Sequence, residues 1–342
     1  MTSKMLKEIR EQPRVLQRIL DEEWGKVRDA ARALRGADRH SVVIVARGTS
    51  DNAALYAKYL FEVLLGIPTA LASPSVFTVY QAWMKFDKAL VMGISQSGES
   101  KDVFETVRRA REFGARTVSL TNDESSPLAQ VSEAHLCLRA GNEESVAATK
   151  TYTAELMLLY LLTIALRGEE RPDASAKRLP EQARQVLEAE WRGTARYRYA
   201  EHLVVVSRGY NLATAKEAAL KLMETAYMVA EAFSGADLKH GPIAMISKDF
   251  PVVAVIPPGK ARASIKAMVE NLSDRGAELV VIGEEGLTDG ASASFVLPLS
   301  CPEELSPILY ILPLQMLAHD LSCLRGLNPD APRGLSKVTE TW

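Results

Sequence analysis

The chain alternates short apolar runs with longer segments whose apolar residues recur at helical spacing. Residues 41–46 read SVVIVA, end at an Arg-Gly pair, and are followed by a helical pattern over 49–66. Similar apolar runs occupy 89–95 and 116–122, with a helical pattern between them over 100–114. Because each run is almost continuously apolar, we expect strands buried on both faces of a parallel sheet. The pattern predicts an α/β fold built on a doubly wound, mostly parallel sheet flanked by helices.

The same pattern occurs a second time. The segment HLVVVSRGYNLATAKEAALKLME matches SVVIVARGTSDNAALYAKYLFE in its strand, its Arg-Gly turn and its alanine-rich helix. Arg47 corresponds to Arg208 and Gly114 to Gly276, so the two copies are offset by almost the same number of residues. Two tandem copies of one fold are the simplest interpretation.

The repeat sets the expected domain boundaries. A strongly apolar helical pattern over 149–166 and a polar, proline-containing connector over 167–182 separate the two copies. We expect an N-terminal helical arm, a first domain, a second domain and a C-terminal tail over 1–35, 36–170, 180–325 and 326–342.

The composition excludes several classes of partner. With 41 basic and 43 acidic residues the formal net charge is -2, and no cationic patch of the kind that binds nucleic acid stands out. There is no signal-peptide pattern and no apolar window near the ~20 residues that span a bilayer, so we expect a cytoplasmic protein without membrane contact. The three scattered cysteines, Cys137, Cys301 and Cys323, are expected to be buried thiols.

A cluster of small polar residues follows two of the predicted strands. Ser95, Gln96, Ser97 and Ser100 follow the run at 89–95, and the segment Gly48-Thr49-Ser50 follows the run at 41–46. In a parallel sheet these positions lie at the carboxyl ends of strands, where helix N-termini present free N–H groups to ligands. The residues therefore predict a binding pocket for a phosphate monoester. The alternative, that they only cap helices, needs a single hydroxyl for each helix.

The second copy differs at the corresponding position. It carries PPGK at 257–260, with prolines in place of hydroxyl side chains. We therefore expect only the first copy to bind phosphate.

Several motifs together resemble a known family. RGTSDNAA, SQSGESKD, VAATKTYT, AKEAALKLMETAYMVAEAFSGADLKHGP and PRGLSKVTE are similar, in order and spacing, to the isomerase half of glucosamine-6-phosphate synthase, a tandem pair of sugar-isomerase (SIS) domains. The resemblance covers essentially the whole chain. Its sequence begins in this region, without the glutaminase domain that precedes it in the synthase. We therefore expect a deaminase that converts glucosamine 6-phosphate and water into fructose 6-phosphate and ammonia.

The resemblance implies three catalytic residues. Glu224 matches the glutamate that moves a proton between C1 and C2 of the sugar, and His240 matches the histidine that opens the ring. In the family this histidine comes from the neighbouring subunit, which implies a homodimer. Lys337 matches the lysine of the C-terminal tail that closes over the sugar and can attack the open-chain ketose.

Further predicted substrate contacts beyond the serine cluster are Val146, Ala147, Lys221 and Ser336. Glu217 lies two helical turns before Glu224 on a similar face, where it is expected either to orient ligands or to pair with Lys221.

The sequence departs from the family pattern at three positions. Arg47 stands where the synthase has cysteine, Met223 where it has lysine, and Ala148 where it has serine. These departures leave the identity of the sugar open.

Other activities on the same scaffold remain open. They are deglycation of a fructosamine 6-phosphate, deamination of galactosamine 6-phosphate, ammonia-dependent synthesis of glucosamine 6-phosphate, and non-catalytic sensing of a sugar phosphate. The sequence contains no metal-ligand cluster and no dinucleotide fingerprint, so we expect no cofactor.

Overall fold

The computed structural model describes residues 3–35, 40–82, 84–86 and 88–337. The chain forms two compact units, and each is assembled from separate parts of the sequence. The N-sheet unit comprises Arg14–Glu143, Lys150–Lys177 and Leu335–Trp342. The C-sheet unit comprises Met1–Pro13, Glu144–Thr149 and Arg178–Gly334.

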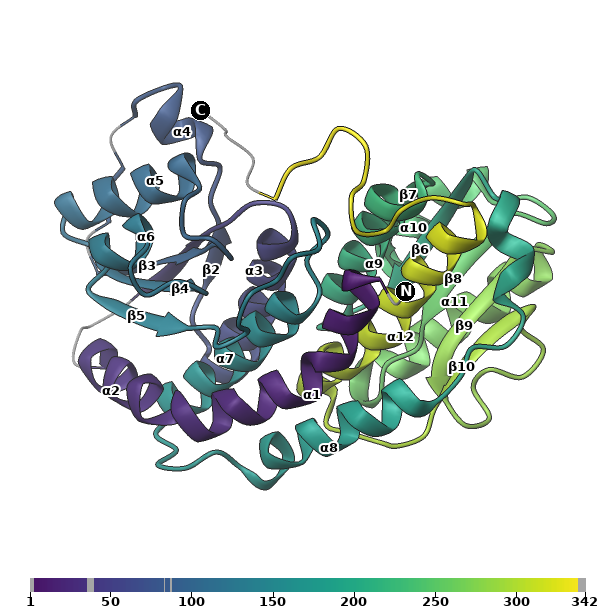
Figure 1. Cartoon of the computed structure of the whole chain (residues 1–342), viewed down its shortest axis with the longest axis horizontal. Coiled ribbons are helices and arrows are strands. Elements are labelled where there is room, and N and C mark those ends of the chain that lie inside the picture. The colour runs from purple at the N-terminus through teal and green to yellow at the C-terminus, as the bar shows by residue number, and fades with distance from the viewer. Residues whose placement is uncertain (1–2, 36–39, 83, 87, 338–342) are drawn as a thin grey trace. The chain divides into compact units, whose positions relative to one another are not determined.

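The N-sheet unit contains a five-stranded parallel sheet with the order β2-β1-β3-β4-β5. Figure 1 labels β2, β3, β4 and β5 of this sheet. Its strands are β1 (Ser41–Val45), β2 (Thr69–Leu71), β3 (Ala89–Ile94), β4 (Arg116–Thr121) and β5 (Ala134–Cys137). Because β1 is flanked by β2 and β3, the chain leaves the centre of the sheet in opposite directions after β1 and after β3. Right-handed crossovers then place the following helices on opposite faces of the sheet.

Helices cover both faces of this sheet. On one face α3 packs against α7, and α7 packs against α2. Residues 150–165 of α7 are all buried, as expected for the apolar pattern seen in the sequence. On the other face α4, α5 and α6 enclose an apolar cluster that includes Val91, Val107 and Leu128. The helices of this unit are α2 (Trp24–Arg35), α3 (Thr49–Leu60), α4 (Ser75–Thr78), α5 (Lys101–Glu112), α6 (Pro127–Val131) and α7 (Lys150–Arg167), with a π-helical turn at Phe61–Leu65. The helix α1 (Lys4–Glu22) belongs to the C-sheet unit up to Pro13 and to the N-sheet unit from Arg14.

The C-sheet unit repeats this topology. Its parallel sheet has the order β7-β6-β8-β9-β10, which is the order of the first sheet with each strand replaced by its counterpart. The strands are β6 (His202–Ser207), β7 (Val229–Ser234), β8 (Pro251–Val255), β9 (Glu278–Glu284) and β10 (Ala293–Leu297). The predicted fold class and its duplication are therefore confirmed.

Helices also cover both faces of the second sheet. On one side α9 packs on β6 and β7 and against α12, while α10 and α11 enclose the cluster around Leu238, Ile265 and Met268. The helices are α8 (Ala174–Glu188), α9 (Asn211–Ala226), α10 (Gly235–Lys239), α11 (Arg262–Asp274) and α12 (Ser306–Leu324). Short 3₁₀ turns lie at Thr194–Tyr199, Pro242–Met245, Gly259–Ala261 and Glu303–Leu305.

Two sequence predictions about helices are wrong. The connector expected over 167–182 becomes helical at Ala174, where the Asp173 carboxylate accepts the N–H of Ala176 and satisfies a free donor of the first turn. The segment Glu303–Leu324 is long and apolar enough to cross a membrane by length and composition, contrary to expectation. However, 78% of its apolar window is buried within the fold.

The cysteine prediction holds for two of the three residues. All three thiols are free, and Cys137 and Cys301 are buried, whereas Cys323 is exposed. Burial raises the pKa of the Cys301 thiol to about 12, so this group stays protonated and inert near neutral pH.

Candidate functional site

The serine turn lies where the sequence places it, between the end of β3 and the start of α5. The N–H of Ser95 donates to Leu120 in the neighbouring strand, and the Ser95 hydroxyl accepts the N–H of Gly98 at 3.2 Å. Ser97 accepts the N–H of Glu99 in the same way. Ser100 occupies the N-cap position of α5, but its side chain makes no capping hydrogen bond. Helix capping therefore does not account for this serine.

The turn presents hydrogen-bond donors that the described part of the chain does not use. The backbone N–H groups of Ser97 and Ser100 and the hydroxyl of Ser100 have no acceptor there. They lie at the N-terminus of a three-turn helix, whose dipole favours negative charge. The arrangement suits an anion such as a phosphate monoester.

A tight backbone conformation holds the turn against the next strand. Gly98 has a φ of +70°, and a Cβ atom built there would lie 2.2 Å from the Ser126 hydroxyl oxygen. The N–H of Asn122 donates to the carbonyl of Gln96, and the N–H of Leu128 donates to that of Gly98. The segment after β4 therefore braces the serine turn along its length.

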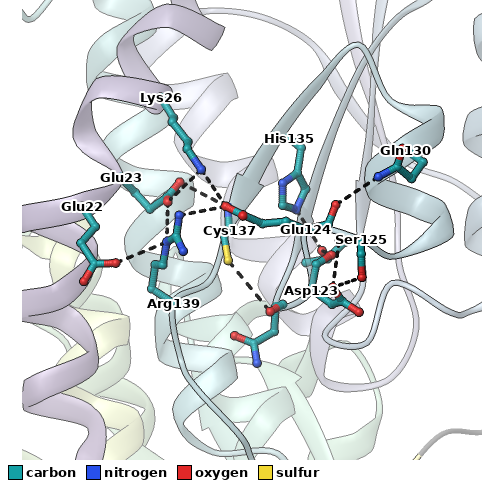
Figure 2. A network of polar contacts seen from close by, with 12 residues as sticks. Glu22, Glu23, Lys26, Asp123, Glu124, Ser125, Gln130, His135, Cys137 and Arg139 are labelled. Atoms are coloured by element: carbon teal, nitrogen blue, oxygen red, sulfur yellow. Dashed lines mark hydrogen bonds and ion pairs between the residues drawn. The ribbon is translucent and has the colours of Figure 1, made fainter.

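A polar network stabilises this bracing segment (Figure 2). The Thr121 hydroxyl bonds to the ring of His135 at 2.9 Å and donates to the Asp123 carbonyl. Beside it, the fully buried Glu23 accepts from the Arg139 side chain at 2.6 Å and from the N–H of Cys137. The network links the residues between α1 and α2 to the carboxyl ends of β4 and β5. It therefore stabilises the segment after β4 that bonds to the serine turn.

The network also governs ionisation. Burial lowers the pKa of His135, so the neutral ring is favoured. The hydrogen bond from Lys26 holds the pKa of Glu124 below its usual range. Both effects favour a neutral histidine beside an ionised carboxylate near neutral pH.

The second predicted loop opens α3. Gly48 is the N-cap residue and Thr49 the first helical residue. The buried Ser50 hydroxyl donates to the Glu155 carboxylate at 2.7 Å, so this hydroxyl already has a protein acceptor. The Ser50 hydroxyl is therefore less able to donate to a ligand than its position in the motif suggests.

Arg47 connects the two loops. Its Nε lies 2.6 Å from the carboxylate of Asp102, which is buried in the first turn of α5. The Arg47 side chain is nevertheless 48% exposed. The sequence indicated a positive charge at this position but gave no sign of its partner.

In the C-sheet unit, α9 brings three of the predicted residues together. Lys221 is fully buried, and its Nζ lies 2.5 Å from Glu224 and 3.4 Å from Glu217. Burial alone lowers the pKa of Lys221, but the two carboxylates offset this and leave the pKa above its ordinary value. A permanent cation therefore lies between two carboxylates.

The two carboxylates of this group differ in access. Glu217 is fully buried, whereas the Glu224 side chain is 22% exposed. Only Oε2 of Glu224 bonds to Lys221, and within the described ranges Oε1 has no hydrogen-bond partner. Glu224 can therefore receive a proton from a ligand while Lys221 keeps it oriented.

The remaining predicted residues lie in several places. His240 follows α10 and is exposed, with a backbone N–H that donates to Asp237. The Nζ of Lys337 lies 2.8 Å from the buried carboxylate of Glu143, and Ser336 is the exposed residue before it. Glu143 is not among the predicted site residues, because nothing in its local sequence pattern marks it.

Val146 and Ala147 belong to the C-sheet unit. The N–H of Val146 donates to the carbonyl of Asp330, and Ala147 is buried. In the ranges that the structure describes, no three acidic, histidine or cysteine side chains are arranged to hold a metal ion.

Comparison with known proteins matches both copies to one family. The SIS domain model matches residues 37–165 and 197–325. Over 339 residues the chain is 38% identical to the glutamine-fructose-6-phosphate aminotransferase (isomerizing) of Methanothermobacter thermautotrophicus, with 97% of this chain and 56% of that protein covered. The chain thus spans little more than half the length of this relative.

Comparison with solved structures points to the same family. A protein from Silicibacter pomeroyi, provisionally assigned as a phosphosugar isomerase, superposes with a TM-score of 0.88 at 34% identity, covering 96% of this chain and all of that one. The C-terminal domain of glucosamine-fructose-6-phosphate aminotransferase from Francisella tularensis gives 0.84 at 26% identity, covering 97% and 99%. The resemblance inferred from the motifs is confirmed.

Proposed function

We propose that this chain, which belongs to the SIS-domain family, interconverts the aldose and ketose forms of a phosphosugar. The substrate that we propose is glucosamine 6-phosphate, which would react with water to give fructose 6-phosphate and ammonia. The observation that carries the proposal is the Glu217–Lys221–Glu224 group, because it supplies an oriented carboxylate with one free oxygen.

Each unit would supply one part of the chemistry. In the N-sheet unit, the turn with Ser95, Gln96, Ser97 and Ser100 and the loop at 48–50 would hold the phosphate. Backbone N–H groups and hydroxyls suit this task because they bind the anion with fixed, short hydrogen bonds. In the C-sheet unit, Glu224 would act on the carbon chain.

The proposed reaction moves one proton and then adds water. In the open-chain aldehyde, Glu224 takes the proton from C2 while O1 gains a proton, which gives an enolamine. Glu224 then returns its proton to C1 while the amino nitrogen loses one. The product is an imine at C2, to which water adds, and ammonia leaves as the C2 carbonyl forms. His240 would open the ring beforehand by passing a hydroxyl proton to the ring oxygen. Lys337 would close over the sugar, after exchanging its bond to Glu143 for one to the substrate.

The direct test is to incubate the protein with glucosamine 6-phosphate and to follow ammonia and fructose 6-phosphate together. We expect both products in equal amounts. Galactosamine 6-phosphate and a fructosamine 6-phosphate serve as competing substrates in the same assay. Turnover of one of these in place of glucosamine 6-phosphate would retain the family reaction and refute the sugar assignment.

Replacement of the proposed base tests the mechanism. Glu224→Gln should lower kcat by at least ~100-fold while substrate still binds, because removal of a general base typically costs this much. Glu270→Gln, an exposed change on α11, is the matched control and should leave kcat unchanged. A Glu224→Gln variant with nearly normal kcat would refute the assignment.

The exposed position of His240 supports a homodimer in which this residue serves the partner subunit. Glu224→Gln and His240→Asn homodimers should each be nearly inactive. Mixed subunits should regain roughly a quarter of wild-type activity, because half of the dimers form with two different subunits and each of these has one intact site. No recovery in a sample shown to contain mixed dimers would refute the shared site.

A further inference from the structure

Tyr227 ends α9 in a backbone conformation that tyrosine rarely adopts. It is the C-cap residue of the helix, and its φ of 54° and ψ of 35° lie in the left-handed region. Glycine is the usual residue at such a helix end, because a Cβ atom makes the left-handed conformation costly. A strained residue persists where its other contacts offset the strain. The contacts of the Tyr227 side chain therefore indicate why a tyrosine stands here.

The Tyr227 side chain holds the part of the C-terminal tail that leads to Lys337. Its hydroxyl accepts the backbone N–H of Arg333 at 2.8 Å. The Arg333 guanidinium lies over the Tyr227 ring, 4.4 Å from the ring centroid. A hydrogen bond and a cation–π contact thus join one tyrosine to the main chain and the side chain of the same residue. Together they fix the direction of the chain at Arg333 as well as its position.

The segment before Arg333 is anchored within the same unit. The Asp330 carboxylate accepts the N–H groups of Lys4 and Met5 at 2.9 and 2.8 Å, at the N-terminus of α1. The carbonyl of Asp330 accepts the N–H of Val146. The contact with Tyr227 extends this anchored segment to Arg333, one residue before the C-sheet unit ends at Gly334.

A glycine follows the anchored segment directly. Gly334 has a φ of +71°, which glycine adopts without strain, and the chain from Leu335 onward belongs to the N-sheet unit. Lys337 comes four residues after Arg333, so the Cα atoms of these two residues can lie no more than about 14 Å apart. The position of Arg333 therefore limits the region that the Lys337 side chain can reach.

The same end of α9 carries the proposed base. Tyr227 follows Glu224 by three residues, and Lys221 orients the Glu224 carboxylate. We propose that Tyr227 is a positioning residue, which holds Arg333 so that Lys337 reaches the sugar on which Glu224 acts. The role in catalysis rests on the proposed function, whereas the anchoring of the tail does not.

Limited proteolysis tests the anchor without requiring turnover. Trypsin must take the Arg333 side chain into its own specificity pocket to cleave the bond to Gly334, so contact with Tyr227 should slow this cleavage. Tyr227→Phe keeps the ring but loses the hydroxyl, and should speed cleavage about threefold. Tyr227→Gly loses both contacts and should speed it at least ~10-fold. Mass spectrometry of the peptides that begin at Gly334 measures the rate.

The glycine variant also separates anchoring from folding. Tyr227→Gly removes the left-handed strain, which offsets the lost side-chain contacts, so the thermal midpoint should stay within about 3 °C of the wild type. Asp249→Gly is the matched control, because Asp249 has a φ of 63° in an exposed turn of the same unit. This control should change neither cleavage after Arg333 nor kcat/KM by more than about twofold.

A double-mutant cycle with Lys337→Ala tests whether Tyr227 acts through the tail. With glucosamine 6-phosphate as the substrate, Tyr227→Gly should lower kcat/KM about 30-fold when Lys337 is present, because two contacts are lost. The same change should cost less than about threefold when residue 337 is already alanine. A residue that affects only the fold or Glu224 would cost the same in both backgrounds.

The outcomes are distinguishable. Unchanged cleavage after Arg333 in the Tyr227→Gly variant would overturn the anchor. An equal loss of kcat/KM with and without Lys337 would overturn the positioning role. Faster cleavage in the Tyr227 variants of a protein that turns over no phosphosugar would retain the anchor, and would refute the proposed function together with the role in catalysis.

Discussion

The turn after β3 and the turn after β8 occupy corresponding positions in the two sheets. They differ in whether a carboxylate of the protein accepts hydrogen bonds from the backbone N–H groups of the turn. In the C-sheet unit the Glu303 carboxylate accepts the N–H of Lys260 at 2.5 Å and that of Ala261 at 3.2 Å. The protein's own carboxylate therefore occupies the free N–H groups ahead of α11. In the N-sheet unit the N–H groups of Ser97 and Ser100 have no such acceptor in the described chain.

This difference shows how a duplicated fold can specialise. Both turns lie at the N-terminus of a helix, where the helix dipole favours an anion. One copy satisfies it internally, and a Cβ atom at Gly259 would lie 2.2 Å from the Glu303 carboxylate, so little space remains. The other copy leaves the donors open and surrounds them with hydroxyls. We infer that only the open turn binds a ligand.

Removal of the serine hydroxyls of the N-sheet turn should have the largest effect on the difference between the two turns. The combined change Ser95→Ala, Ser97→Ala and Ser100→Ala should raise KM for the phosphosugar about 100- to 1000-fold, with a smaller effect on kcat. The reason is loss of hydrogen bonds to a charged phosphate rather than loss of the base. Steady-state kinetics measures both constants. An unchanged KM in a folded variant would show that phosphate binds elsewhere.

Substitution of the turn glycine tests the bracing. Gly98→Ala forces a Cβ against Ser126 and an alanine into the left-handed region, and should destabilise the N-sheet unit by about 2–3 kcal/mol. Thermal unfolding with and without fructose 6-phosphate measures the loss. We also expect the ligand to protect this variant less than it protects the wild type. Equal protection would contradict the link between turn geometry and binding.

Removal of the carboxylate that occupies the turn after β8 should have a smaller effect. Glu303→Ala leaves the N–H groups of Lys260 and Ala261 without their acceptor and should lower the unfolding free energy by about 1–2 kcal/mol. KM for the phosphosugar should not change, because we propose that the phosphate binds at the serine turn of the N-sheet unit. A large rise in KM in the folded variant would mean that the two turns have been assigned the wrong way round.

The smallest effect concerns pH. Burial places the pKa of His135 below its ordinary value of 6.5, so the unfolded chain takes up a proton that the folded chain resists. Stability should therefore fall as the pH drops through 6.5 toward the folded-state pKa, and level off below it. His135→Gln should remove this component. Denaturant midpoints at several pH values measure it, and an identical pH dependence in the variant would refute the assignment.

The sequence predicted the central features of the fold because they are local. Continuous apolar runs identified the inner strands, and their repetition identified the second copy. The strands β2, β5, β7 and β10 escaped notice, since they lie at the sheet edges and several of their residues are exposed or only partly buried. Such half-exposed segments lack the continuous pattern that identified the others.

The sequence predicted only those parts of the candidate site that lie within a single short motif. The serine turn and the spacing of Glu217, Lys221 and Glu224 are visible in short stretches of sequence. The closure of the second turn by Glu303 is not, because 43 residues separate the carboxylate from Lys260. Similarly, the Arg47–Asp102 ion pair depends on the adjacency of β1 and β3, which only the assembled sheet provides.

The most direct test is a crystal structure of the Glu224→Gln variant with fructose 6-phosphate bound. We expect the phosphate at residues 95–100, within hydrogen-bonding distance of the Ser97 and Ser100 N–H groups, and no ligand at 257–260. A phosphate bound at 257–260, or an empty serine turn in a crystal that contains the sugar, would contradict the account.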